Sequence, residues 1–132
     1  MTDKELVVLA KEAMEHAYVP YSHFKVGAAL LAKDGRVFKG CNIENASYGA
    51  TNCAERTAVF KAVSEGCREF DAIAIVASSG DLVPPCGICR QFMKEFCDDD
   101  FIICMADVND TYEAHTLAEI LPYSFSSREH MT

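Results

Sequence analysis

Two cysteine segments constrain this chain more than any other feature of its sequence. Cys53-Ala54-Glu55-Arg56 comes first, and Pro85-Cys86-Gly87-Ile88-Cys89 follows further along the chain. Each segment stands at the start of an apolar run with helical periodicity, with Asn52 as the expected cap of the first run and Pro85 leading into the second. Backbone N–H groups at a helix N-terminus favour thiolate over thiol, and thiolate is the form that binds metal.

The spacing of these cysteines predicts a metal site. Thiolates from Cys53, Cys86 and Cys89 would hold Zn²⁺ and leave the fourth tetrahedral position to water, an arrangement typical of a catalytic zinc site. Glu55 follows the first ligand closely enough to reach that water without binding the metal. A carboxylate in this position is suited to moving protons.

Two other interpretations of the cysteines remain open. In a structural zinc site, Cys41 or His23 would close the coordination shell, although such sites usually combine two short ligand pairs and this chain has one Cys-x-x-Cys. In the other interpretation Cys86 and Cys89 form a redox dithiol at a helix start, which would assign no role to the Cys53-Ala54-Glu55 segment. The cysteines outside the two segments are interpreted as small buried hydrophobic residues: Cys41, Cys67, Cys97 and Cys104.

Composition limits the classes of protein that fit. A chain of 132 residues with 50% hydrophobic content predicts a single domain over residues 1–132, with a disordered tail from about residue 126. A basic N-terminal region and an apolar run of about 20 residues are both absent, which predicts a cytoplasmic protein without a membrane partner. Seven cysteines are an odd number, which does not suit a disulfide framework. The net charge of -8 argues against a nucleic-acid partner and favours a small uncharged substrate.

The order of periodic segments predicts an α/β fold. Helices are expected over residues 2–16, 53–66, 86–97 and 117–121, and strands over 26–32, 36–41, 71–77, 101–106 and 112–116. Asp34-Gly35 predicts a hairpin, and the strand, helix, strand order from 71 to 106 predicts a right-handed parallel crossover. Together they form a three-layer α/β/α sandwich with a mixed five-stranded sheet, and both cysteine segments lie at the carboxyl ends of strands, where ligands collect.

A polar stretch over residues 42–52 supplies further candidates. Asn42 and Glu44 are two apart in an extended segment, so their side chains point the same way and could bind a sugar together. The alternative is that both residues only stabilise a turn.

At this point the chain resembles a known family. The Cys-x-Glu and Pro-Cys-x-x-Cys pattern is the signature of zinc-dependent deaminases. Four segments are similar to the homotetrameric short-chain cytidine deaminases, and the resemblance extends over nearly the whole chain: 24–30, 40–49, 53–56 and 85–91. It implies one Zn²⁺ per subunit, the sandwich fold, and hydrolysis of cytidine and deoxycytidine to uridine, deoxyuridine and ammonia in pyrimidine salvage.

Alternatives to this activity share the zinc core. A blasticidin-type or other aminopyrimidine nucleoside deaminase is the nearest one. Deaminases that edit polynucleotides use His as the first ligand, whereas this chain has Cys53 and no basic stripe. A catalytically inactive zinc-binding assembly protein belongs to a different class, but Glu55 is intact.

The resemblance also implies individual roles. Phe24 would stack on the pyrimidine and Ala54 would contact the base through its backbone, while Asn42 and Glu44 would hold the 3′-hydroxyl of the ribose. Arg56 would donate hydrogen bonds to the ligand thiolates and so offset their negative charge.

The C-terminal segment resembles a family element that completes a neighbouring active site. In Leu121-Pro122-Tyr123-Ser124-Phe125 the resemblance implies that Phe125 reaches the pocket of another subunit, and Tyr48 would also cross the interface. The implied assembly is a homotetramer with composite active sites. The alternative is that Phe125 anchors the tail on its own core.

Overall fold

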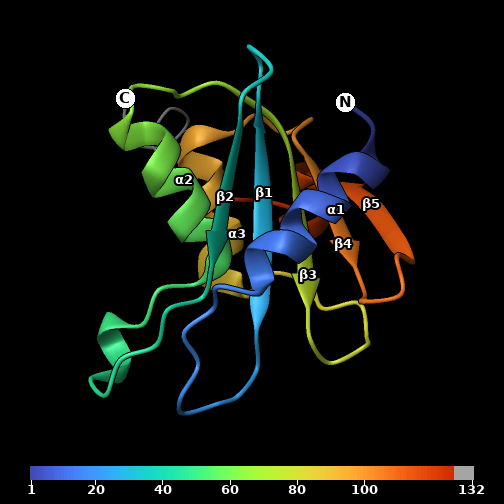
Figure 1. Ribbon diagram of the computed structural model, residues 1–132. Helices are drawn as coiled ribbons and strands as arrows, with labels where there is room; N and C mark the ends of the chain where they lie inside the picture. Colours follow the sequence, from blue (N-terminus) through green and yellow to red (C-terminus); the bar gives the residue numbers. More distant parts are fainter. Residues whose placement is uncertain (127–132) are drawn as a thin grey trace.

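A five-stranded sheet forms the centre of the molecule (Figure 1). This computed structural model describes residues 1–126. The strands are β1 (Val26–Ala32), β2 (Val37–Cys41), β3 (Phe70–Ala77), β4 (Ile102–Ala106) and β5 (Tyr112–Thr116), in the spatial order β2-β1-β3-β4-β5. Only the pair β3 and β4 is parallel among the paired strands of residues 1–126. Every predicted strand is confirmed to within one residue at each end.

Helices cover both faces of this sheet. They are α1 (Asp3–Met14), α2 (Ala54–Ser64), α3 (Gly87–Phe96) and the short α4 (Leu117–Ile120). In Figure 1, α1 lies in front of the sheet and α3 behind it, so the predicted three-layer sandwich is confirmed. The first helix begins with the predicted capping box, in which the side chains and backbone of Thr2 and Glu5 bond reciprocally. No helix within residues 1–126 has the length and hydropathy to cross a bilayer.

The two faces of the sheet carry side chains of different size. Successive residues of a strand point to opposite faces, so β1 and β3 each contribute to two separate cores. The face toward α2 and α3 carries large residues: Leu30, Ile73, Ile75, Ile103 and Met105. The face toward α1 carries mostly alanine: Ala29, Ala72, Ala74 and Ala106. The smaller side chains let α1 approach so closely that a Cβ on Gly27 would lie 2.1 Å from the Ala10 carbonyl oxygen.

Strand direction brings the two cysteine segments to one edge of the sheet. Because β1 is antiparallel to both β2 and β3, the strands β2, β3 and β4 all run the same way. The helix α2 follows β2 along the chain and α3 follows β3, so both helices begin beyond the carboxyl ends of their strands. The expected position of both segments is therefore confirmed.

Three details differ from the sequence-based predictions. Asn52 does not cap α2, because Cys53 is the N-cap residue and the Asn52 side-chain amide donates instead to Thr57 Oγ1 at 3.0 Å. The polar stretch 42–52 contains a short 3₁₀ turn, η1 (Tyr48–Ala50), that its composition did not indicate. Ser126, the first residue of the predicted tail, is buried, and residues 127–132 lie outside the described part of the chain.

The cysteines outside the two segments lie mostly in the core. Cys67, Cys97 and Cys104 are buried as predicted, whereas Cys41 at the end of β2 is only partly buried. Burial raises the pKa of Cys97 and of Cys104 to about 12, so neither thiol ionises readily.

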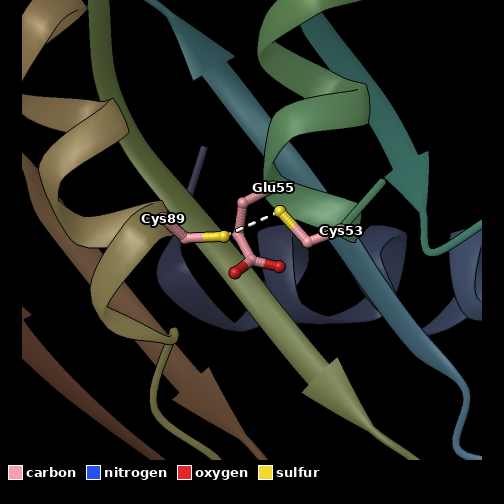
Figure 2. Close-up of side chains that lie close together, drawn as sticks. All are labelled: Cys53, Glu55 and Cys89. Atoms are coloured by element: carbon pink, nitrogen blue, oxygen red, sulfur yellow. Dashed lines mark hydrogen bonds between the residues drawn. The ribbon is translucent and has the colours of Figure 1, made fainter. Parts of the chain in front are cut away.

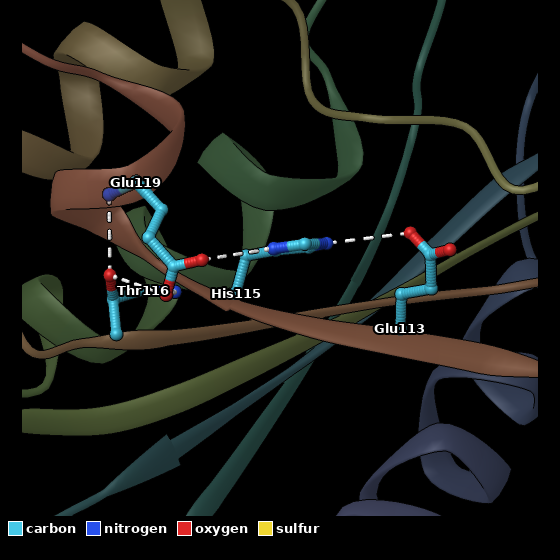
Figure 3. A network of polar contacts seen from close by, with 4 residues as sticks. All are labelled: Glu113, His115, Thr116 and Glu119. Atoms are coloured by element: carbon cyan, nitrogen blue, oxygen red, sulfur yellow. Dashed lines mark hydrogen bonds and ion pairs between the residues drawn. The ribbon is translucent and has the colours of Figure 1, made fainter.

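A polar network joins β5 to α4 at one edge of the sheet (Figure 3). His115 Nδ1 lies 3.2 Å from Glu119 Oε2, and its Nε2 lies 3.4 Å from Glu113 Oε2. The hydrogen bonds with Glu119 and then Glu113 raise the pKa of His115. This contribution to stability is therefore complete below the ordinary histidine pKa of about 6.5 and is lost as the pH rises through the raised value.

The close approach of β2 to α2 gives a test of the fold. A Cβ on Gly40 would lie 2.5 Å from Ala58 N and 2.6 Å from Ala54 O, so Gly40→Ala forces α2 away from the sheet. Overpacking of this kind costs about 1–3 kcal/mol, and we expect the thermal unfolding midpoint to fall by about 5–10 °C. Gly49→Ala is the control, because nothing lies within 4 Å of its added Cβ. Equal midpoints for the two variants would contradict this packing.

Candidate active site

The structure gathers the three predicted zinc ligands at the converging ends of two helices. Cys53 is the N-cap residue of α2, Cys86 is the N-cap residue of α3, and Cys89 lies in the first turn of α3. Cys53 Sγ lies 2.7 Å from Cys89 Sγ, and Cys86 Sγ lies 3.4 Å from Cys89 Sγ. None of these three cysteines forms a disulfide.

The Glu55 carboxylate joins this cluster. Figure 2 shows the side chains of Cys53, Glu55 and Cys89 converging from α2 and α3. Their donor atoms lie within 4.8 Å of one another, close enough to share one metal ion. Sulfur donors with a carboxylate beside them fit zinc, which prefers thiolate, imidazole and carboxylate ligands.

Burial and charge set the protonation of these groups. Glu55 is only 4% exposed, and burial, together with the nearby Cys53 thiolate, raises its pKa to about 7. The hydrogen bond from Cys89 lowers the pKa of Cys53, and Arg56 lowers it further. The same bond, together with burial, raises the pKa of Cys89.

Arg56 is placed to neutralise the sulfur cluster. Its Nε donates to Cys53 Sγ at 3.0 Å, and its Nη2 donates to the Thr51 carbonyl oxygen at 3.3 Å. Arg56 lies three positions after Cys53 along the chain, which places both on one side of the first turn of α2. The guanidinium therefore stabilises the ionised form of the Cys53 thiol.

A cavity of about 250 Å³ opens beside the cluster. The predicted site residues that line it are Phe24, Asn42, Cys53, Ala54, Glu55, Arg56 and Cys86. Its volume lies just below the roughly 300–1,000 Å³ of most ligand sites, so one subunit encloses space for a small molecule only.

Four other predicted site residues do not line this cavity within the single chain: Cys89, which is fully buried, and Glu44, Tyr48 and Phe125. Glu44 and Tyr48 line an adjoining cavity, with Thr51 on the wall of both. The Tyr48 side chain is 76% exposed, and its ring meets Tyr21 edge-on at a centroid distance of 6.1 Å. Phe125 is 56% exposed, and its carbonyl oxygen accepts a hydrogen bond from Gln91 Nε2 at 2.8 Å.

The structure adds residues that the sequence did not single out. Val26 and Ile75 form the apolar floor of the cavity, and Val83 and Pro84 come from the loop before α3. The sequence could have indicated two of these residues by their positions in the predicted strands. Val26 starts β1 and Ile75 lies near the end of β3, and both strand ends lie at the ligand-binding edge of the sheet.

The family model described as the cytidine and deoxycytidylate deaminase zinc-binding region matches residues 1–105, which include the whole sulfur cluster. The chain belongs to this family. Its members bind zinc, so the sequence-based resemblance and the zinc cofactor are both confirmed.

Individual relatives are similar to this chain over nearly their full length. Cytidine deaminases from Halalkalibacterium halodurans and Sporosarcina psychrophila are 53% and 50% identical to it over 129 residues, covering 98% of this chain and 98% and 95% of theirs. The crystal structure of cytidine deaminase from Burkholderia pseudomallei superposes with a TM-score of 0.91 and 47% identity, covering 95% of this chain and all of that one.

The alternative activity corresponds to a more distant relative. Blasticidin-S deaminase from Bacillus cereus is 32% identical over 132 residues, covering 94% of this chain and 92% of that protein. This deaminase chain is therefore more similar to the cytidine deaminases above than to that enzyme.

The ligand set can be tested by zinc content. We expect Cys53→Ala, Cys86→Ala and Cys89→Ala each to weaken zinc binding by more than about 100-fold, because even residues that only support metal ligands account for about 10–100-fold. The measurement is zinc per subunit in purified protein after dialysis against a chelator. Cys67→Ala is the matched control, since this buried thiol lies in the core. Stoichiometric zinc in any of the first three variants would show that the ligand set is wrong.

Proposed function

We propose that this chain catalyses the hydrolytic deamination of cytidine and deoxycytidine to uridine and deoxyuridine, with release of ammonia. The observation that carries the proposal is a buried carboxyl group, Glu55, gathered with cysteine sulfurs at the wall of a small cavity. The identity to curated cytidine deaminases over nearly the full chain favours this substrate. We place the reaction in pyrimidine salvage in the cytoplasm, where free thiols persist.

Glu55 is the proposed acid and base of the reaction. Bound zinc would supply Lewis acidity and make water easier to deprotonate. Glu55 takes a proton from the attacking water and delivers it to N3 of the cytosine, and the water oxygen adds to C4. Glu55 then takes the remaining proton from the new C4 hydroxyl and passes it to the amino group, so that the C4–N bond breaks, ammonia leaves and C4 becomes a carbonyl. A pKa raised to about 7 suits a group that must both accept and donate protons near neutral pH.

Arg56 is proposed to set the charge of the cluster. Three thiolates around Zn²⁺ give a net charge of about -1, which weakens the metal as a Lewis acid. The donation from Arg56 Nε to Cys53 Sγ at 3.0 Å withdraws part of this charge.

The cavity wall supports the proposed substrate contacts. Phe24 would stack on the pyrimidine, the Ala54 backbone would contact the base, and Asn42 with Glu44 would hold the ribose. Asn42 already bonds Val26 N and Phe24 O, so its second amide hydrogen serves the sugar. A neutral nucleoside fits this site better than a polynucleotide, because a chain with net charge -8 repels phosphate.

Replacing the acid and base group tests the mechanism. We expect Glu55→Gln to lower kcat by at least roughly 10²–10⁴-fold, because positioned proton transfer contributes that much and this residue serves several transfers. Zinc content should stay at the wild-type value. Glu65→Gln at the exposed C-terminal end of the same helix is the control and should keep full activity. Near-normal turnover of Glu55→Gln, followed by ultraviolet absorbance of cytidine, would rule out this role.

We further infer that the functional unit is a homotetramer with composite active sites. Tyr48 and Phe125 lie outside the cavity of their own chain, and both side chains are exposed. The outer surface of α2 and α3 also exposes apolar side chains. Phe60 packs edge-on against Phe92 at a centroid distance of 5.1 Å and is 47% exposed, and Ile88 is 62% exposed. An exposed apolar surface of this kind is typical of a protein interface, and further copies of the chain are the occupant we propose.

The composite site can be tested at Phe125. If its ring covers the base in a neighbouring subunit, Phe125→Ala should raise KM for cytidine by about 5- to 150-fold, the range for loss of one base–aromatic stack. Zinc content should not change. Tyr112→Ala is the control, because it removes another exposed ring on the outer strand β5, which carries none of the proposed site residues. A fully active monomer, measured by sedimentation at the assay concentration, would disprove the shared site.

A further inference from the structure

The segment between α1 and β1 carries Phe24 to the cavity without regular secondary structure (Figure 1). Its start is fixed by backbone bonds, since Tyr18 N donates to Asn42 O at 3.0 Å and Glu44 N donates to Tyr18 O at 2.9 Å. Beyond this point the chain makes a turn that includes His23 in the left-handed region, with φ of 60°. One backbone bond closes this turn, from His23 N to Val19 O at 3.0 Å, and side chains hold the rest of it.

The Glu44 carboxylate anchors this turn. Its Oε1 accepts hydrogen bonds from the backbone N–H groups of Tyr21 and Ser22, both at 3.1 Å. Its Oε2 accepts a bond from the Ser22 hydroxyl. Bonds to an ionised carboxylate are stronger than bonds between neutral groups, so the turn is fixed to the segment after β2. A carboxylate has about four acceptor positions, which leaves about one for a sugar hydroxyl.

The Ser22 hydroxyl connects the Glu44 carboxylate to the backbone of Phe24. A hydroxyl has one proton and two lone pairs, and because the proton goes to Glu44, the lone pairs face other donors. One of them accepts the N–H of Phe24 at 3.0 Å. On the other side Asn42 Nδ2 donates to the Phe24 carbonyl oxygen at 2.8 Å. Both backbone polar groups of Phe24 are thus held by side chains.

We propose that Ser22 is a positioning residue, whose hydroxyl couples Glu44 to Phe24 and fixes the aromatic wall of the cavity before the nucleoside binds. The proposal rests on the stacking role of Phe24 in the proposed function. An alanine side chain can neither donate to Glu44 nor accept from Phe24. In Ser22→Ala the Phe24 wall of the cavity is therefore not held in advance and must be ordered when the nucleoside binds, which weakens binding. The predicted zinc ligands and Glu55 lie at α2 and α3, outside this segment. The substitution therefore leaves the groups that carry out the chemical step in place.

The test compares variants of Ser22 in the zinc-loaded enzyme. Ser22→Ala should raise KM for cytidine by about tenfold and change kcat by less than about twofold, as expected when substrate binding is weakened without loss of transition-state contacts. Ser22→Thr keeps a hydroxyl, and its methyl group finds space because Ser22 is exposed, so KM should stay within about threefold of wild type. Ser64→Ala at the far end of α2 is the matched control. An unchanged KM in Ser22→Ala would overturn the proposal.

A double-mutant cycle with Phe24→Ala identifies the route of the effect. If Ser22 acts through Phe24, then Ser22→Ala should change the KM of the Phe24→Ala enzyme by less than about twofold. Effects that multiply would mean that Ser22 acts through Glu44 and the sugar, and would overturn the proposal. Phe24→Ala alone tests the proposed function separately, because an unchanged KM there would remove the stacking role whatever Ser22 does.

A further variant covers the case in which Ser22→Ala folds poorly. Ser22→Cys offers a weak donor and acceptor, so its KM should fall between those of the wild type and Ser22→Ala. The zinc content and thermal midpoint of each variant are measured alongside. A wild-type KM in Ser22→Cys would also contradict the proposal, because a thiol does not reproduce the two hydroxyl bonds.

Discussion

The structure depends on two helices that begin at the same edge of the sheet, each with a cysteine at its N-cap position. Cys53 and Cys86 are the N-cap residues of α2 and α3, and Cys89 brings its sulfur to 2.7 Å from that of Cys53. A helix start presents unpaired N–H groups and a positive dipole end. Negative charge on sulfur is therefore stabilised from two directions, and this convergence follows from β2 and β3 running the same way.

The depth of the site depends on how closely α2 packs on the sheet. Gly40 on β2 leaves no space for a Cβ, since Ala54 O and Ala58 N lie 2.6 and 2.5 Å from its ideal position. Ala54 and Ala58 are fully buried, so the first turn of α2 is pressed against the strand. Glu55 lies in that turn and is buried with it, which raises its pKa to about 7. The close packing of small residues thus contributes, through burial, to the raised pKa of Glu55.

Sequence patterns predicted the features that depend on short spacing. The capping box at Thr2, the Asp34-Gly35 hairpin and the helix starts at Cys53 and Cys86 are set by neighbours along the chain. The orientation of Glu44 was not accessible in this way, because its partners Tyr21 and Ser22 precede it by more than twenty residues. The Glu44 carboxylate holds the turn at Tyr21 and Ser22 rather than a turn within residues 42–52, and its role toward a sugar stays a prediction that its remaining acceptor capacity allows.

The segment from Asn42 to Cys53 links the two ends of the cavity. At one end Asn42 fixes the backbone of Phe24, and at the other Cys53 opens α2. Ile43 and Asn52 exchange two backbone hydrogen bonds of 2.9 Å, which close the stretch between them into a loop. This pair of bonds keeps the aromatic wall at a fixed position relative to the sulfur cluster. The loop that it closes can project away from the cavity without disturbing it, and Tyr48 lies there, exposed and in reach of another subunit in the proposed tetramer.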